Sequence, residues 1–226
     1  INSDDTYLLD RWTLLSDGND IVDVSQVTTP VPTGSYSAAR FDIETEDKKF
    51  GFIQILEAKD AARFIGGTVS LSFKARMGTG DTSTLLRAAV LSWSSTADTV
   101  TSDIVNAWGA EGTNPTLVAN WTFENTPAAL TALTAAYQTY KIENISIDTA
   151  STTNIAVFIW SDDMTNAVGD LVYITDVQLE LGSVATDFEP RPYQQELALC
   201  QRYYYKVSGT FGVAWAQSTT TVLCHT

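Results

Sequence analysis

The chain offers few residues that could form a catalytic centre. Its only histidine is His225, next to the last of 226 residues, which is a poor place for the base of a Ser-His-Asp or Cys-His arrangement. The sequence contains no HExxH, CxxC, P-loop or GxGxxG motif. Asp162 and Asp163 are adjacent, so in a strand their carboxylates would point to opposite faces; a dyad formed in a loop is the alternative. The sequence therefore predicts a protein that is not an enzyme.

Tryptophan residues point to a different chemistry, the binding of sugars. An indole ring can cover the apolar face of a pyranose, while neighbouring amide groups bind its hydroxyl groups. Six tryptophans occur in the chain, and Trp108 and Trp121 border a long polar segment that also holds Asn106 and Asn120. We therefore predict these four residues as glycan-binding candidates, with the two tryptophans as an exposed platform. The alternative is that both rings are buried, as we expect for Trp12.

The charge of the chain restricts its partners. The formal net charge is −14 and the isoelectric point is about 4.2. A nucleic-acid-binding surface must be basic, and anionic lipid also repels an acidic protein. No apolar run approaches the roughly 20 residues of a membrane span. We therefore expect neither nucleic-acid binding nor membrane insertion.

Strand-like periodicity predominates up to about residue 181 and predicts an antiparallel β-sandwich. The segment 68–77 places apolar residues at every second position, whereas 50–57 has apolar residues on both faces and so should be covered on both sides. Residues 58–67 predict a short helical turn, and 94–118 a long loop with a turn of helix near 105–108. The predicted strands are 11–16, 20–27, 35–44, 50–57, 68–77, 85–93, 117–124, 137–147, 154–162 and 170–182.

A short helix is predicted after the sandwich. Pro192 suits the first turn of a helix, and residues 194–206 contain neither glycine nor proline. A narrow stripe on this helix would cover one partner surface, which is either the chain's own β-structure or another copy of the chain. The stripe consists of Tyr193, Leu197, Cys200 and Tyr204.

The end of the chain predicts a second β region. Phe211, Val213 and Trp215 alternate with small or polar residues, as in a first strand. Basic residues outnumber acidic ones after residue 190, three to one, whereas residues 1–190 hold ten basic and 26 acidic residues. This change marks a boundary. Because the sequence lacks an initial methionine and stops within a strand-like segment, we expect a piece of a longer protein.

One stretch resembles a known family. Residues 171–206 read LVYITDVQLELGSVATDFEPRPYQQELALCQRYYYK. This stretch is similar to a segment near the C-terminal part of many bacteriophage tail-fibre and related virion proteins, where a carbohydrate-binding-module-like jelly roll ends in DVQLE.GS.ATPFE.RP...EL..CQRYY. The strands GGTVSLSFKARM and AAYQTYKI also resemble the core of these modules. The resemblance covers roughly residues 7–206, and Asp187 departs from the usual proline.

The resemblance implies a jelly roll in residues 1–186, a linker and short helix in 187–206, and the start of a second, truncated β region in 207–226. It also implies a non-catalytic structural protein of the virion, a tail-fibre or adhesin element that forms homotrimers, contacts other virion proteins and binds host surface polysaccharide. The alternatives are a capsid or tail decoration protein that clamps its neighbours, and the accessory binding module of a depolymerase.

A structural calcium ion is the only cofactor that the resemblance implies, at the place where the first and last strands meet. Calcium prefers several oxygen ligands. Asp10 and Asp176 are the residues that could supply carboxylates there. The alternative is that Asp176 faces solvent or caps a turn.

Overall fold

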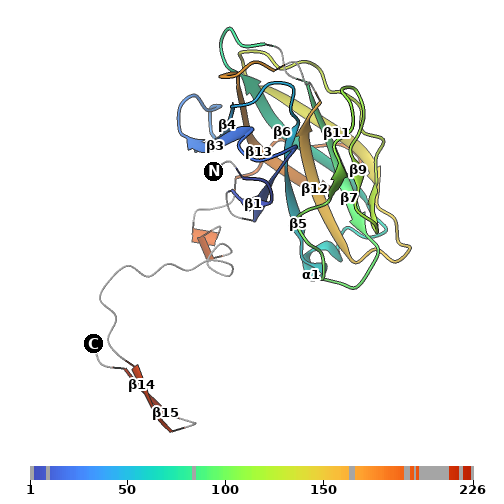
Figure 1. The fold of residues 1–226 in the computed structure, drawn as a ribbon. Coiled ribbons are helices and arrows are strands. Elements are labelled where there is room, and N and C mark those ends of the chain that lie inside the picture. Colours follow the sequence, from blue (N-terminus) through green and yellow to red (C-terminus); the bar gives the residue numbers. More distant parts are fainter. Residues whose placement is uncertain are drawn as a thin grey trace. The chain divides into compact units, whose positions relative to one another are not determined.

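The chain forms two compact units, Ile1–Pro190 and Arg191–Thr226, in a computed structural model. The structure describes residues 3–8, 11–82, 85–162, 166–190, 194–195, 197–198, 214–218 and 221–224. The first unit is a jelly-roll sandwich of two antiparallel sheets, which confirms the predicted fold class (Figure 1).

Sheet A has six strands, and all of its pairings are antiparallel. In spatial order they are β1 (Thr6–Tyr7), β2 (Trp12–Ser16), β5 (Phe50–Leu56), β12 (Asn154–Ser161), β7 (Leu86–Trp93) and β10 (Trp121–Phe123). Sheet B has five antiparallel strands, and its order is β11 (Gln138–Ser146), β6 (Thr68–Met77), β13 (Leu171–Leu181), β4 (Ala38–Ile43) and β3 (Val22–Val27).

The main core lies between the two sheets and is built from their inward-facing side chains. In β6 the apolar residues alternate, and Val69, Leu71, Phe73 and Ala75 are buried in this core, as the sequence predicts. Ser70 and Ser72 on the other face are also buried. Trp12 is half-buried and packs on the Phe52 ring, with 4.9 Å between the centroids, which confirms its expected place at the core.

Strand β5 is covered on both faces, as its two apolar faces predict. Phe52 packs into the main core, whereas Ile53 packs into a second cluster on the outer face of sheet A. Gly51 allows β12 to approach this closely. A Cβ atom there would lie 2.7 Å from the Cβ atom of Trp160 and 2.8 Å from the carbonyl oxygen of Ile159.

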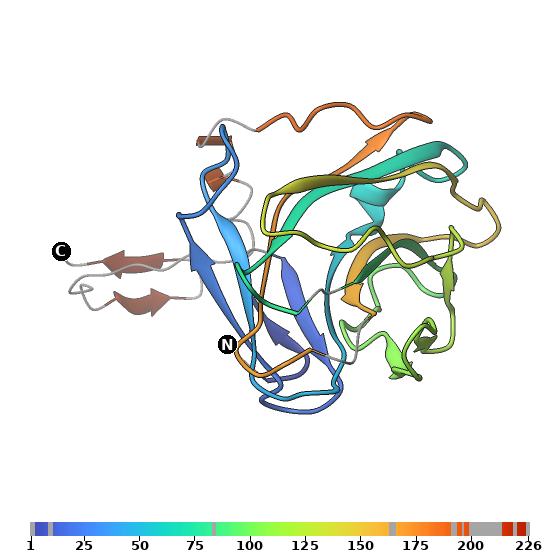
Figure 2. The same cartoon turned by 90° about the horizontal axis from the view of Figure 1, so that it is seen from above.

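Residues 94–120, which we call the covering segment, pack over the second cluster. This segment connects β7 to β10 and is the green stretch at the lower right of Figure 2. It contains β8 (Val105–Ala107) and β9 (Thr116–Leu117), which pair antiparallel. The predicted turn of helix near 105–108 is therefore wrong, because the backbone of this stretch pairs with β9. The short helix α1 (Ala58–Ala61) lies where a helical turn was predicted.

The second unit contains an antiparallel hairpin of β14 (Ala214–Ser218) and β15 (Thr221–Cys224). These strands lie within residues 207–226, for which the second β region stays a prediction. Among the described residues of the predicted helix, Leu197 is helical and 39% exposed. The other residues of the predicted stripe, Tyr193, Cys200 and Tyr204, lie outside the described residues. The described part of the chain holds no helix of the length and hydropathy that a membrane span requires.

Candidate functional site

The outer face of sheet A is lined with aromatic rings. Phe158 and Trp160 alternate on β12 and stack, with 4.6 Å between their centroids. Phe123 of β10 lies 6.1 Å from Trp160, and Trp108 of the covering segment lies 6.2 Å from Phe158. Exposure of so many apolar rings to water would be unfavourable. Ile104 and Leu117 of the covering segment pack on them and exclude water.

The four predicted glycan-binding residues have different environments. Asn106 and Asn120 are exposed, and Trp108 is half-buried against Phe158. Asn120 adopts a left-handed backbone conformation with φ of 73°, and its carbonyl oxygen accepts a hydrogen bond from the Ser94 backbone N–H at 3.0 Å. Trp108 is thus partly exposed, whereas both asparagines are exposed.

Trp121 is not an exposed platform, so this part of the prediction is wrong. Only 6% of the residue is exposed. Its ring lies 5.4 Å from that of Trp93, its partner in the neighbouring strand, and both belong to the outer cluster of sheet A. The reason is that directly paired residues of an antiparallel sheet project to the same face, which here is roofed.

An open pocket of about 430 Å³ lies on the outer face of sheet A, beside α1. Ile55 and Val100 supply apolar walls, and Glu57, Asp98 and Asn154 supply polar groups. Ile55 comes from β5, Glu57 precedes α1, and the others come from the covering segment and β12. A pocket with apolar walls and a few convergent polar groups is typical of small-ligand sites.

Hydrogen bonds hold the polar wall of this pocket in place. Asn154 is buried, and its Nδ2 donates to Asp98 Oδ1 at 2.7 Å and to the Leu56 carbonyl oxygen at 3.0 Å. The Ala58 backbone N–H also donates to Asp98 Oδ1, at 2.8 Å, and the Asp98 N–H donates to Asn154 Oδ1 at 3.0 Å. Asn154 is thus a positioning residue that ties the covering segment to β5.

Asp98 is the exposed hydrogen-bonding group of the pocket. The hydrogen bond from the Ala58 backbone, with that from Asn154, holds the pKa of the Asp98 carboxyl below its usual range. Both bonds use Oδ1, and Oδ2 accepts no hydrogen bond from the described residues. Asp98 therefore presents an ionised oxygen to solvent beside the apolar walls. Such an acceptor suits hydroxyl groups.

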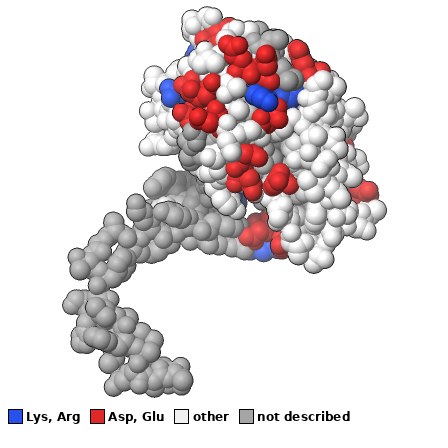
Figure 3. All heavy atoms as spheres, viewed as in Figure 1, with Lys and Arg blue, Asp and Glu red and all other residues white. Residues whose placement is uncertain are grey.

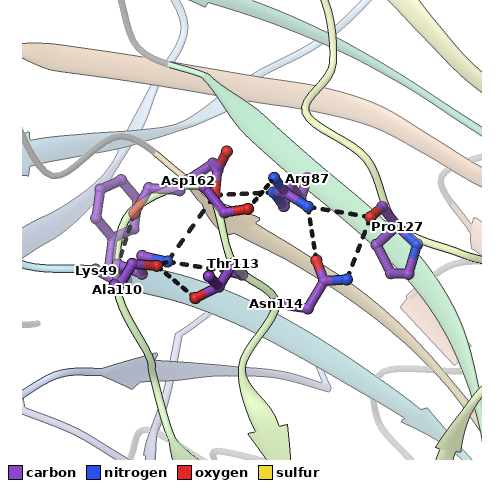
Figure 4. A network of polar contacts seen from close by, with 10 residues as sticks. Lys49, Arg87, Ala110, Thr113, Asn114, Pro127 and Asp162 are labelled. Atoms are coloured by element: carbon purple, nitrogen blue, oxygen red, sulfur yellow. Dashed lines mark hydrogen bonds and ion pairs between the residues drawn. The ribbon is translucent and has the colours of Figure 1, made fainter.

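A buried ionic network anchors the covering segment (Figure 4). Lys49 is fully buried, and its Nζ donates to the carbonyl oxygens of Ala110 at 2.8 Å and Thr113 at 3.1 Å. Asp162 Oδ1 lies 3.9 Å from this Nζ. Burial lowers the pKa of Lys49, and the Asp162 carboxylate opposes this shift.

Arg87 is the second cation of the network. Its Nε forms an ion pair with Asp162 Oδ1 at 2.8 Å, without the alignment of a hydrogen bond. Its terminal nitrogens donate to Asn114 Oδ1 and the Gly112 carbonyl oxygen, both at 2.8 Å, and to the Pro127 carbonyl oxygen at 3.0 Å. Asp162 therefore serves as a counter-ion and is withdrawn from solvent, which fits a structural role. Asp163 lies outside the described residues.

Of the two predicted calcium ligands the structure describes Asp176 alone, so a calcium ion shared by both stays a prediction. Asp10 lies outside the described residues. Asp176 lies at a bulge of β13 with φ of 53°, where its Oδ2 accepts hydrogen bonds from Lys74 Nζ at 2.8 Å and Ser35 Oγ at 2.7 Å. The Asp176 carboxylate is thus paired with the ammonium group of Lys74. Neither solvent exposure nor turn capping describes Asp176. The described residues contain no group of three or more potential metal ligands.

Comparison with known proteins places the fold. No protein-family model and no curated protein matches the sequence. The C-terminal family 22 carbohydrate-binding module of Clostridium thermocellum Xyn10B superposes with a TM-score of 0.50 at 12% identity, over 82% of this chain and 95% of that one. The first unit therefore has the fold of a carbohydrate-binding-module-like jelly roll.

Two further structures show lower similarity. The CBM22-1 xylan-binding domain of Paenibacillus barcinonensis Xyn10C has a TM-score of 0.49 at 14% identity, over 81% of this chain and 94% of that one. The enzymatically active domain of bacteriophage CBA120 tailspike protein 4 has a TM-score of 0.46 at 15% identity, over 80% of this chain and 21% of that one.

Sequence inspection missed the pocket. Its lining residues Ile55, Asp98 and Asn154 are separated by dozens of positions, and none belongs to a motif. The one local signal was Asp98 in the polar stretch SSTADT, a residue type that tolerates the left-handed conformation it adopts, with φ of 56°.

Proposed function

We propose that this chain is a non-catalytic glycan-binding part of a phage virion protein, in a tail fibre or adhesin that contacts polysaccharide on the host surface. The observation that carries glycan binding is the open pocket with the Asp98 carboxylate beside Ile55 and Val100. The carbohydrate-binding-module-like fold supports the same function. The resemblance of residues 171–206 to phage fibre proteins supports the virion location.

The pocket offers the two kinds of contact that sugars use, apolar walls and hydrogen-bonding groups. Its volume lies within the roughly 300–1,000 Å³ of typical ligand pockets. The apolar walls would pack on C–H groups of a pyranose, while Asp98 Oδ2 would accept hydrogen bonds from its hydroxyls. Trp108 offers a second contact on the same covering segment, since the residue is partly exposed.

The binding is proposed to be non-catalytic. Hydrolysis of a glycoside uses two carboxyl groups on either side of the scissile bond. Asp98 is stabilised in its ionised form, which is unsuited to a general acid, and Asp162 is engaged by two cations. Cleavage of a polysaccharide by this chain alone would contradict the proposal.

Replacing Asp98 with Asn should weaken glycan binding by about tenfold or more, because a hydrogen bond to a charged acceptor is lost. The Asn side chain can still accept from the Ala58 and Asn154 donors through Oδ1, so the pocket keeps its wall. The measurement is a screen on bacterial surface polysaccharides, followed by calorimetry with the neutral oligosaccharide that binds most tightly.

Asp47→Asn is the matched control for this test. Asp47 is also exposed and also has φ of 56°, so the two substitutions change the same charge in the same backbone conformation. Equal affinities of the D98N and D47N variants would contradict the pocket. If W108A loses binding while D98N keeps it, the glycan binds at Trp108 and not in the pocket. Failure to bind any glycan would favour a decoration role.

We expect the intact protein to be a homotrimer, as a fibre element requires. The observation that supports self-association is the exposed helical Leu197, one residue of the predicted stripe. Light scattering on the intact protein should give three times the mass of the intact chain, of which these 226 residues contribute 24.6 kDa. A Leu197→Asp variant should lower this mass, whereas a monomeric wild type would contradict the expectation.

A further inference from the structure

The outer face of sheet B carries a row of arginine and tyrosine side chains. Tyr173 of β13 is paired directly with Arg76 of β6 on one side and with Arg40 of β4 on the other. Directly paired residues project to the same face. Their neighbours Ala75 and Ile174 face the core, so the row Arg76, Tyr173 and Arg40 lies on the outside.

Arg76 is held in a defined orientation within this row. Its guanidinium carbon lies 5.1 Å from the ring centroid of Tyr173 and 5.8 Å from that of Tyr137. Its Nε donates to the Met77 carbonyl oxygen at 2.9 Å. The guanidinium is thus placed by two rings and one hydrogen bond, which is the arrangement that preorganises arginine for planar anions.

Arg76 has no acidic partner among the described residues, unlike its neighbours. Lys74 pairs with Asp176 at 2.8 Å, and Arg40 lies 4.0 Å from Asp42. The terminal nitrogens of Arg76 form no hydrogen bond with the described part of the chain. The chain carries a net charge of −14, and acidic side chains outnumber basic ones on the face seen in Figure 3. Within the residues that the structure describes, Arg76 thus lacks an acidic partner although acidic residues are abundant.

The described groups around Arg76 do not neutralise its positive charge, so the guanidinium can bind an anion. The Asp176 carboxylate already accepts from Lys74 and Ser35, so it is neutralised. Burial raises the pKa of Tyr137 to about 12, and its neutral hydroxyl donates to the Pro30 carbonyl oxygen at 2.9 Å. The Tyr137 phenol therefore brings no negative charge to Arg76 at neutral pH.

An exposed aromatic ring borders the same face. Ser35 and Ser37 are attached to sheet B, since Ser35 Oγ donates to Asp176 and Thr175 Oγ1 donates to the Ser37 carbonyl oxygen at 2.7 Å. Tyr36 stands between them and is 85% exposed. An exposed ring and an unpaired guanidinium on one sheet face are suited to a ligand with an apolar ring face and a carboxylate.

We propose that Arg76, with Tyr137 and Tyr173, forms a second binding site that recognises the carboxylate of an acidic sugar. The claim that the ligand is a sugar rests on the proposed function. The carboxylate accepts hydrogen bonds from the terminal nitrogens of Arg76, which the rings of the buried Tyr173 and of Tyr137 orient. The exposed ring of Tyr36 on the same face is available to the sugar ring. The site is separate from the pocket at Asp98, which is on the outer face of sheet A.

The test compares oligogalacturonate with its methyl ester, using calorimetry on the full 226-residue chain. The wild type should bind the acid at least about tenfold more tightly than the ester, because a charged, bidentate hydrogen-bonded pair is lost on esterification. Arg76→Gln should remove this preference. Arg76→Lys keeps the charge but not the planar fork, and should retain only part of it.

Arg63→Gln is the matched control. Arg63 is exposed, and its guanidinium carbon lies 4.5 Å from the centroid of the Phe64 ring. Its replacement by Gln changes the net charge by the same amount as Arg76→Gln. It should keep the preference for the acid. Equal affinities for acid and ester, or equal losses in R63Q and R76Q, would overturn the site. Thermal unfolding of each variant shows whether it is folded, and R76K supplies the comparison if R76Q is not.

The binding experiments distinguish between the two proposed sites. Binding of neutral glycans that depends on Asp98, without any preference for the acid, would leave the proposed function standing and overturn the Arg76 site. Binding of oligogalacturonate that depends on Arg76 and is unchanged in D98N would support the Arg76 site alone.

Discussion

Replacing Asp162 with Asn should lower the free energy of unfolding by about 3–5 kcal/mol. Lys49 is fully buried and Arg87 nearly so, and Asp162 is the carboxylate that contacts both. The substitution removes the negative charge and leaves two cations in a medium that solvates them poorly. Urea denaturation should show a lower midpoint, and the covering segment should exchange its amide hydrogens faster, because both cations anchor it.

Asp17→Asn is the matched control for this prediction. Asp17 also pairs with a lysine, Lys48, at 3.2 Å, but both side chains are well exposed. Such a pair contributes at most about 1 kcal/mol. A loss in D162N as small as that in D17N would contradict the buried network as a source of stability.

The pH dependence of D162N gives an independent check. Burial lowers the pKa of folded Lys49 below its ordinary value near 10.5, and Asp162 limits this shift. Without Asp162 the folded pKa should fall further. Between the folded pKa and 10.5 the unfolded chain binds more protons, so stability increases with pH in that window. The deficit of D162N should therefore shrink from neutral pH towards pH 10, and a constant deficit would contradict the assignment.

Replacing Trp121 with Ala should also lower the free energy of unfolding by about 3–5 kcal/mol, the usual range for a buried tryptophan. Its ring packs with Trp93 beneath the covering segment, so the truncation leaves a cavity that a three-residue strand cannot easily close. The measurement is the midpoint of urea denaturation, together with the slope, which shows whether the native state has loosened.

Trp108→Ala provides the comparison for Trp121. Trp108 contacts the same cluster but is only half-buried, so its truncation should cost less stability. Loss of glycan binding in W121A would then report a disturbed covering segment, whereas loss in W108A at near-normal stability would report a contact with the ligand. Equal destabilisation by both substitutions would contradict the difference in burial.

Period-2 patterns predicted the sandwich well, because burial on one face of a strand forces apolar side chains into alternate positions. The strand 68–77 is found with the predicted bounds as β6, and the doubly covered strand 50–57 is β5. The stretch 105–108 was wrongly predicted. It is too short to carry a pattern, and its backbone pairs with residues 116–117, which local sequence does not indicate.

The residues that matter for binding were harder to predict. Trp108 and Trp121 are similar in sequence context, yet one is half exposed and the other buried. The burial of each tryptophan depends on whether the covering segment packs over its ring. That packing is formed between segments distant in the sequence. The same reason hides Asp98, whose position depends on hydrogen bonds with Ala58 and Asn154.

The sequence by itself determined the all-β class, the strand positions, the acidic character and the family resemblance, because these follow from local alternation, composition and a contiguous motif. Tertiary structure alone decided where functional groups meet. The pairing of Lys49 with Asp162, the pocket around Asp98 and the contacts of Arg76 with the rings of Tyr137 and Tyr173 all join residues far apart in the chain. Sheet order and the path of the covering segment create these contacts, and desolvation in the packed sandwich gives them their strength.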